Sequence, residues 1–195
     1  IEYTIIPDRI EAGTFLIAAA ITKGDILIKD VQPKHLKIVL ESLQLAGMKL
    51  EIGQDTIHIM PRNISILPVN MITEVYPGFP TDLQAQWMAL MSQASGSSKI
   101  TDNIYSDRFT HIPELSRFGA NINLNRNEAS IKGRNTLVAA PVMSTDIRAS
   151  ASLIIAALAA KGKSSISRIY HIDRGYENIE VKLSTLGADI IRKQE

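Results

Sequence analysis

An internal repeat is the feature that most constrains how this chain can fold. Three segments share one layout at a spacing of about 70 residues, and each contains two glycines at matching places. The glycine pairs are Gly24 and Gly47, Gly96 and Gly119, and Gly162 and Gly187. Because glycine is favoured just after the end of a helix, every one of these glycines is predicted to close a helix. The chain is therefore predicted to consist of three similar units.

The two helices of each unit differ in their periodicity. Residues 14–21, 83–91 and 149–160 are apolar nearly all round, which is typical of helices buried on every side. Residues 35–43 and 176–183 instead carry apolar side chains at three- and four-residue intervals, with charged residues between them. That spacing predicts outer helices with one buried face.

Short alternating runs predict strands between the helices. They occupy residues 26–28, 50–52, 57–59 and 122–124, and we expect the first residues of the chain to begin inside a strand as well. Each unit would then be strand, inner helix, strand, outer helix and hairpin. Three such units around three buried helices make an inside-out α/β barrel, a pseudo-threefold prism. A solenoid is the alternative, but solenoid helices are seldom apolar on all faces.

Composition excludes several classes of function. With 21 basic and 20 acidic residues, the net charge of +1 gives no overall electrostatic case for binding nucleic acid or a membrane surface. The longest apolar run, 153–160, is far shorter than the roughly 20 residues of a membrane span. Cysteine is absent and the four histidines lack ligand spacing, so no metal is expected. Neither a Walker loop nor a dinucleotide-binding turn is present, and no cofactor is expected.

Several motifs resemble the enolpyruvyl transferase family. They are Pro7–Phe15, Phe79–Gln86, Arg108–Arg117, Thr145–Ala151 and Ile169–Glu177. The resemblance extends over essentially the whole chain, and the family's inside-out barrel agrees with the prism predicted above. It also implies a two-domain enzyme of which this chain is the second half. Residues 1–12 would be an interdomain linker or first strand, and 13–195 one domain of three repeats, at about 4–70, 71–138 and 139–195.

The resemblance also implies a reaction. Phe79–Gln86 and His171–Glu177 look like the branch of the family that acts on an amino sugar. That branch transfers the enolpyruvyl group of phosphoenolpyruvate to the 3-hydroxyl of UDP-N-acetylglucosamine, releases phosphate, and serves cytoplasmic peptidoglycan synthesis. The expected partners are therefore these two substrates and the missing N-terminal domain. The shikimate 3-phosphate branch is the alternative, as is a binding module of this fold without catalysis.

Asp82 matches the family aspartate at the sugar 3-hydroxyl, which implies that it is the catalytic base and contacts substrate. The alternative is an N-cap or an acid in the first turn of a helix, worth about 1 kcal/mol, and the two roles can coexist. Ile104 matches a family position that contacts the sugar; its alternative is a residue in the core of a strand. The acid of the family reaction is usually a cysteine of the other domain, so this chain is expected to hold half a site.

Arg108, Arg148 and Arg174 match family arginines that hold phosphoenolpyruvate and the reacting phosphate. Arg174 is also expected to take part in catalysis. Arginine suits these ligands because its planar fork binds a carboxylate or a phosphate through two parallel hydrogen bonds. The alternative for each is an ordinary surface arginine. Asp146, just before Arg148, is expected to be a helix cap or an orienting partner.

Overall fold

The structure, a computed structural model, describes residues 1–61, 65–133 and 136–193. Its elements are α1 (Arg9–Thr22), β1 (Ile26–Ile28), η1 (Pro33–Leu36), α2 (Lys37–Leu45), β2 (Lys49–Ile52), β3 (Ile57–Met60), β4 (Met71–Thr73), η2 (Thr81–Leu83), α3 (Gln84–Met91), β5 (Ser97–Asp102), α4 (Ile112–Arg117), β6 (Asn121–Asn125), β7 (Glu128–Lys132), β8 (Pro141–Met143), α5 (Ile147–Ala159), β9 (Ser165–Ser167), η3 (Ile169–Arg174) and α6 (Ile179–Thr185).

The order of elements repeats along the chain. The series α1, β1, α2 and the β2–β3 hairpin recurs as α3, β5, α4 and the β6–β7 hairpin, and begins again as α5, β9 and α6. A further strand, β4 or β8, precedes the inner helix of the second and third units. The predicted strands at 26–28, 50–52, 57–59 and 122–124 are confirmed as β1, β2, β3 and β6.

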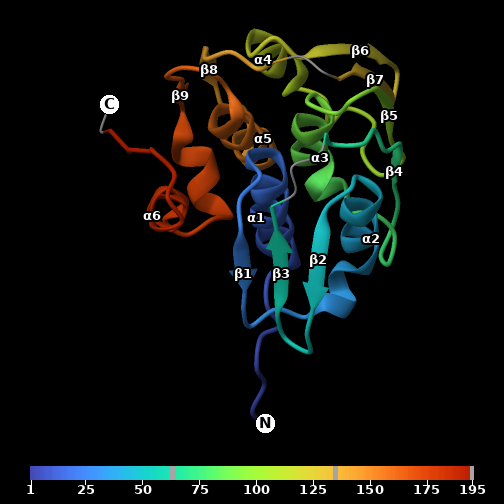
Figure 1. Cartoon of the computed structure of the whole chain (residues 1–195), viewed down its shortest axis with the longest axis vertical. Coiled ribbons are helices and arrows are strands. Elements are labelled where there is room, and N and C mark those ends of the chain that lie inside the picture. Colours follow the sequence, from blue (N-terminus) through green and yellow to red (C-terminus); the bar gives the residue numbers. More distant parts are fainter. Residues whose placement is uncertain (62–64, 134–135, 194–195) are drawn as a thin grey trace.

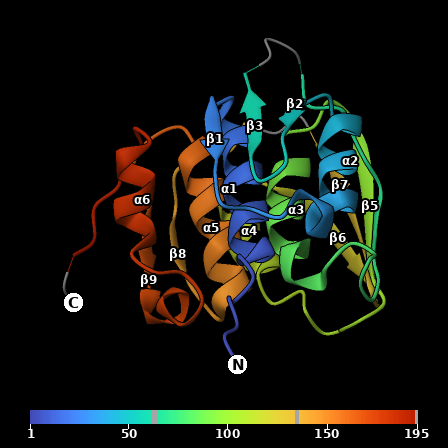
Figure 2. The same ribbon diagram turned by 90° about the horizontal axis from the view of Figure 1, so that it is seen from below.

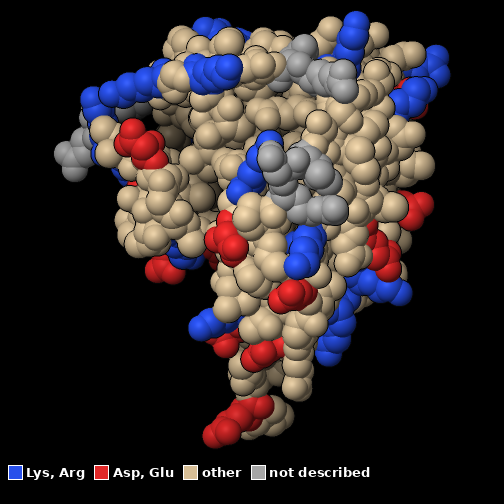
Figure 3. Space-filling model, viewed as in Figure 1, with Lys and Arg blue, Asp and Glu red and all other residues tan. Residues whose placement is uncertain are grey.

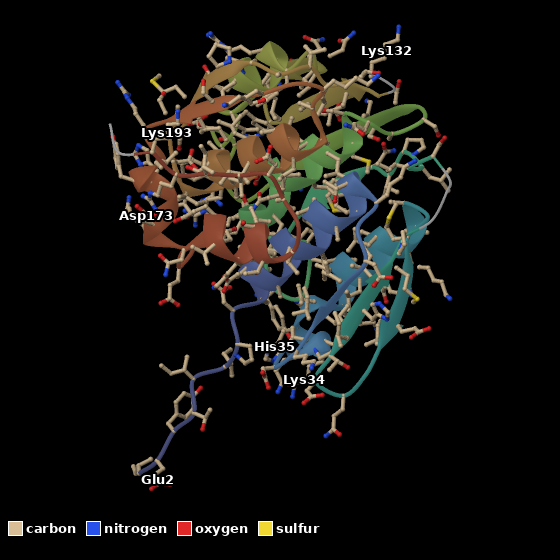
Figure 4. All side chains as sticks on the ribbon, turned by 60° about the vertical axis from the view of Figure 1, so that its left-hand side comes forward. Glu2, Lys34, His35, Lys132, Asp173 and Lys193 are labelled. Carbon is tan, nitrogen blue, oxygen red and sulfur yellow. The ribbon has the colours of Figure 1, made fainter. Side chains whose placement is uncertain are left out.

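Two expected elements are missing from this series. Residues 1–8 form neither helix nor strand, and the segment extends away from the body, with Glu2 near its tip (Figures 1 and 4). A strand needs a neighbour for its backbone N–H and C=O groups, and this extended segment has none, so the expected first strand does not form here. In the third unit, no hairpin follows α6 in the residues described up to 193.

The residues described by the structure form three sheets. The first is antiparallel, in the order β1-β3-β2, with Ile26 opposite Ile59. The second has the order β4-β5-β7-β6, in which β4 and β5 are parallel and the other pairs antiparallel. The third is the parallel pair β8-β9, with Val142 opposite Ile166. Each sheet belongs to one unit, so the chain is an α/β structure with separate outer sheets.

The helices α1, α3 and α5 lie at the centre of the molecule (Figures 1 and 2). All eight residues of α3 are buried, and α3 packs against both α1 and α5. The three predicted inner helices are thereby confirmed. Since full burial of a large apolar side chain contributes about 1.5–3 kcal/mol, this packing is a principal source of stability.

The outer helices also agree with the prediction, with one shift. In α2 the buried apolar residues are Val39, Leu40 and Leu43, as expected for one buried face. The helix predicted from Tyr176 begins only at Ile179, because Asn178 takes a left-handed conformation with φ 46°. Tyr176 is buried instead, and its hydroxyl lies 2.7 Å from Thr14 Oγ1.

A short chain of hydrogen bonds joins the three units at the centre. Thr14 of α1 meets Tyr176 of the third unit, and Gln86 Nε2 of α3 donates to Thr14 Oγ1 at 3.2 Å. Leaving a buried polar group without a hydrogen bond costs free energy. These bonds therefore favour one relative setting of the three units.

The second glycine of each unit behaves as predicted. Gly47, Gly119 and Gly187 follow α2, α4 and α6 with φ of 94°, 89° and 96°. The first set does not: Gly162 is left-handed, with φ 104°, but it lies two residues beyond Ala160, the extended residue that caps α5. At α1 the left-handed residue is Lys23 rather than Gly24. Gly96 directly precedes β5, where a Cβ would lie 3.0 Å from Pro68, so close packing explains that glycine better than a helix cap.

The surface carries no dominant charge on the face seen in Figure 3, where basic and acidic side chains are interspersed. Among the described residues, no helix is both long and apolar enough to cross a bilayer.

We predict that Gly187→Ala destabilises the chain by about 1 kcal/mol, because an L-residue at this φ is strained. A Cβ at Gly187 would meet nothing within 4 Å, so the loss would come from the backbone alone. Gly24→Ala is the matched control, since Gly24 also follows a helix but is not left-handed. Urea denaturation of both variants measures the difference; equal stabilities would contradict the prediction.

Candidate functional site

Asp82 lies in η2, the single turn that leads into α3. The residue before this turn is Pro80, which has no side chain able to cap it, and the Asp82 carboxylate accepts no backbone N–H among the described residues. Asp82 is therefore not the N-cap, but it is an acid in the first turn of η2, the other form of that alternative. Instead, the carboxylate faces away from the helix toward two cations.

Arg108 and Arg148 both donate to the same oxygen of Asp82. Arg108 Nη1 lies 2.8 Å from Asp82 Oδ1, and Arg148 approaches it with Nε at 2.8 Å and Nη2 at 2.6 Å. The three side chains are 21–33% exposed. Such half-open ion pairs contribute little to stability. They leave further guanidinium N–H groups available to an anionic ligand.

The two arginines come from different units. Arg108 lies in the loop between β5 and α4, where its guanidinium also stacks over the Tyr105 ring at 5.2 Å. Arg148 is in the first turn of α5. Asp146 caps that helix by accepting from the backbone N–H groups of Arg148 and Ala149, as expected. The cluster therefore lies where the inner helices α3 and α5 begin.

Below this cluster lies Asp102, a fully buried carboxylate at the end of β5. Its Oδ2 accepts from Thr81 Oγ1 at 2.6 Å. Its Oδ1 accepts from Thr73 Oγ1 and from the backbone N–H groups of Ile104 and Tyr105. Burial raises the pKa of Asp102, but these hydrogen bonds outweigh burial and hold the pKa below its ordinary value of 3.8.

Ile104 lies just beyond the end of β5 and is 43% exposed. The alternative that it is a strand core residue is therefore wrong. The chain leaves the sheet here because the Asp102 side chain accepts hydrogen bonds from the backbone N–H groups of Ile104 and Tyr105. Such bonds from an aspartate to the amides that follow it stabilise a turn.

Arg174 is not part of the hydrogen-bonded cluster. It is exposed at the end of η3 and makes no hydrogen bond or ion pair to a residue that the structure describes. Its neighbour Asp173, labelled in Figure 4, binds Arg192 through both oxygens, at 2.8 and 2.5 Å. The expected role of Arg174 in catalysis and substrate binding stays a prediction.

Sequence reasoning missed three residues near the cluster: Thr81, Asp102 and His111. One signal for Asp102 was available in the sequence. In a strand every second residue faces the same side, so Asp102 lies on the same buried face as Ser98 and Ile100. His111 lies behind the cluster, with Nε2 3.1 Å from Met88 Sδ. Burial lowers the pKa of His111 to about 4, although the nearby Asp146 raises it.

Comparison with known proteins identifies the family of the chain. The family model for EPSP synthase (3-phosphoshikimate 1-carboxyvinyltransferase) matches residues 1–183. The chain belongs to this family. Among solved structures, the enolpyruvyl transferase NikO from Streptomyces tendae superposes with a TM-score of 0.87 at 26% identity, covering 96% of this chain and 44% of NikO. EPSP synthase from Acinetobacter baumannii gives 0.75 at 16% identity, covering 98% and 44%, and so shows the fold alone.

Curated relatives are about half identical to the chain over the aligned residues. UDP-N-acetylglucosamine 1-carboxyvinyltransferase from Chlorobium chlorochromatii is 53% identical over 96% of this chain and 44% of its own length. The enzyme of that name from Pelodictyon phaeoclathratiforme is 50% identical over 100% and 46%. The chain thus spans about half the length of the curated relatives it matches.

We predict that His111 makes stability fall as the pH falls from about 6.5 to 4. In the unfolded chain His111 takes up a proton near its ordinary pKa of 6.5, whereas in the folded chain it stays neutral down to about pH 4. The unfolded state binds more protons across this window, which weakens folding by about 3 kcal/mol at its lower end. Urea denaturation at several pH values measures this; His111→Asn should flatten the curve, and an unchanged slope would contradict the prediction.

Proposed function

We propose that the whole protein transfers the enolpyruvyl group of phosphoenolpyruvate to the 3-hydroxyl of UDP-N-acetylglucosamine and releases phosphate. This chain would be one half of that enzyme. The observation that carries the proposal is the convergence of Arg108 and Arg148 on Asp82, inside the motifs of the family. Relatives with 50–53% identity bear the name of this activity, which supports the same substrates here.

The fold supports a finer description of the chain. We infer an inside-out α/β barrel, because α1, α3 and α5 are central and the sheets lie outside them. We divide it into repeats at about 4–70, 71–138 and 139–195, with residues 1–12 as the linker to the other domain. That domain is then the partner that completes the site.

Asp82 serves as the base in this proposal. It removes the proton from the sugar 3-hydroxyl as the oxygen attacks C2 of phosphoenolpyruvate, while an acid outside this chain protonates C3. The tetrahedral intermediate then loses a proton from C3 to a basic group of the completed site as the C2–O bond to phosphate breaks, which leaves free phosphate and the C2=C3 double bond of the enol ether. A base held within hydrogen-bond reach of the hydroxyl typically accelerates such a step by roughly a hundred- to ten-thousand-fold.

The arginines balance the negative charges of the reactants. Arg108 and Arg148, with Arg174 brought in when substrates bind, would hold the phosphate and carboxylate of phosphoenolpyruvate. Their remaining N–H donors allow this while contact with Asp82 is kept or exchanged. Ile104, exposed beside the cluster, would contact the sugar. The resulting product belongs to peptidoglycan synthesis, which places the enzyme in the cytoplasm.

Two other functions are separable by one assay. The family model is named for the shikimate 3-phosphate reaction, and a binding module would retain the fold without turnover. Release of phosphate by the full-length protein is measured with phosphoenolpyruvate and either UDP-N-acetylglucosamine or shikimate 3-phosphate. We expect turnover only with the amino sugar, and none from the 195-residue chain alone, because its acid lies elsewhere. Turnover with shikimate 3-phosphate, or with neither acceptor, would overturn the proposal.

We predict that Asp82→Asn in the full-length enzyme lowers kcat by roughly a hundred- to ten-thousand-fold, as expected for loss of a general base. The melting temperature should change little, because the ion pairs of Asp82 are partly exposed. Asp25→Asn is the matched control, since Asp25 is an exposed carboxylate paired with His58 and should leave kcat unchanged. A kcat of Asp82→Asn within threefold of wild type would refute the assignment.

A further inference from the structure

Asp102 has more partners than a structural carboxylate at a strand end requires. It is fully buried and its side chain accepts four hydrogen bonds, two from threonine hydroxyls and two from backbone amides. A buried charge is tolerated only when it is well paired, so its presence calls for an explanation. Its two oxygens face two different parts of the proposed site.

The Oδ2 side reaches Asp82 through two intermediates, Thr81 and Arg108. Thr81 Oγ1 donates its hydrogen to Asp102 Oδ2 at 2.6 Å, which leaves its lone pairs free to accept from Arg108 Nη1 at 3.2 Å. The same nitrogen of Arg108 donates to Asp82 Oδ1 at 2.8 Å. Thr81 thus gives Arg108 Nη1 a second acceptor beside Asp82, and the direction of the Thr81 hydroxyl determines whether that acceptor is available.

The Oδ1 side holds the turn that carries Ile104. It accepts from the amides of Ile104 and Tyr105, both at 2.9 Å, and from Thr73 Oγ1 at 2.7 Å. Thr73 Oγ1 in turn accepts from the Asn103 amide at 3.1 Å. Three successive amides of this turn thus depend on Asp102, directly or through Thr73.

We propose that Asp102 is a positioning residue that sets Arg108 on Asp82 through one oxygen and fixes the Ile104 turn through the other. The consequence for catalysis rests on the function proposed above. Asp102 touches no reacting atom in this scheme. We therefore expect Oδ2, through Arg108, to affect kcat, and Oδ1, through the Ile104 turn, to affect KM for UDP-N-acetylglucosamine.

Asp102→Asn separates these two effects. In this variant only the side-chain oxygen of the asparagine can accept hydrogen bonds from the amides of Ile104 and Tyr105. We therefore expect this oxygen to keep the turn and the side-chain NH2 group to face Thr81. This NH2 donates to Thr81 Oγ1 and competes with Arg108 for its lone pairs. In the full-length enzyme we expect kcat to fall about ten- to a hundredfold, as misplacement of a group by about 1 Å does, with KM for UDP-N-acetylglucosamine within about threefold. Asp102→Ala should change both constants.

Thr81→Val tests whether Asp102 acts through Thr81. If it does, Asp102→Asn combined with Thr81→Val should be no slower than Thr81→Val alone, because residues of one network are not additive. Ser98→Ala is the control. Ser98 is buried in the same strand as Asp102 and its hydroxyl donates to Met91 Sδ. Its substitution removes a buried hydrogen bond away from the site, and we expect kcat to be unchanged. Additive losses, or a kcat of Asp102→Asn within threefold of wild type, would overturn the proposal.

A crystal structure of Asp102→Asn tests the geometry without any activity. We expect Arg108 to leave Thr81 and Asp82 while the turn at 103–105 is unchanged; an Arg108 still in place would also overturn the proposal. This readout stays valid if the wild-type enzyme proves inactive with UDP-N-acetylglucosamine, so a failure of the proposed function is distinguishable from a failure of the role of Asp102.

Discussion

The enclosure of α3 between α1 and α5 is the interaction on which the rest of the structure depends. This helix has no exposed face, and it buries even Gln84 and Trp87, whose side-chain N–H groups find no partner among the described residues. Leaving such groups unpaired costs roughly 1–3 kcal/mol each. The apolar contacts of α3 with α1 and α5 must outweigh that loss.

This packing also explains where the site lies. Asp82 stands directly before α3, and Arg148 in the first turn of α5. Because the two helices are packed along their length, their starting turns are held at a fixed separation, and the two side chains meet. Arg108 enters from the β5–α4 loop, which rests on the buried Asp102. A rigid core therefore carries a cluster whose side chains are themselves partly open to ligands.

The site is unevenly organised across the three units. Asp82 and Arg108 of the second unit and Arg148 of the third are joined by hydrogen bonds, and Thr81 links Arg108 to Asp102. Arg174, also of the third unit, is exposed and makes no pair within the described chain. The third unit also carries the smallest sheet, the pair β8-β9. The paired cluster around Asp82 and the unpaired Arg174 are compatible with the proposed reaction, in which ligands and a second domain would complete the site.

The fold was largely predictable because its signals are local. All-round apolar helices and alternating strands follow from periodicity, and Gly47, Gly119 and Gly187 mark helix ends because their φ is left-handed. The predictions were wrong where the local structure depends on a contact with a residue distant in the sequence. Residues 1–8 lack a neighbouring strand, and Tyr176 is drawn to Thr14 rather than into α6.

The sequence by itself determined the three-unit α/β layout, the inner helices and the candidate residues, through periodicity and motifs that need no knowledge of contacts. Only the tertiary structure decided that Asp82 pairs with Arg108 and Arg148 instead of capping a helix, and that Asp102 lies beneath them. The physical reason is distance along the chain. Asp82 and Arg148 are 66 residues apart, and a hydrogen bond between them exists only once the packing of α3 on α5 has set their positions.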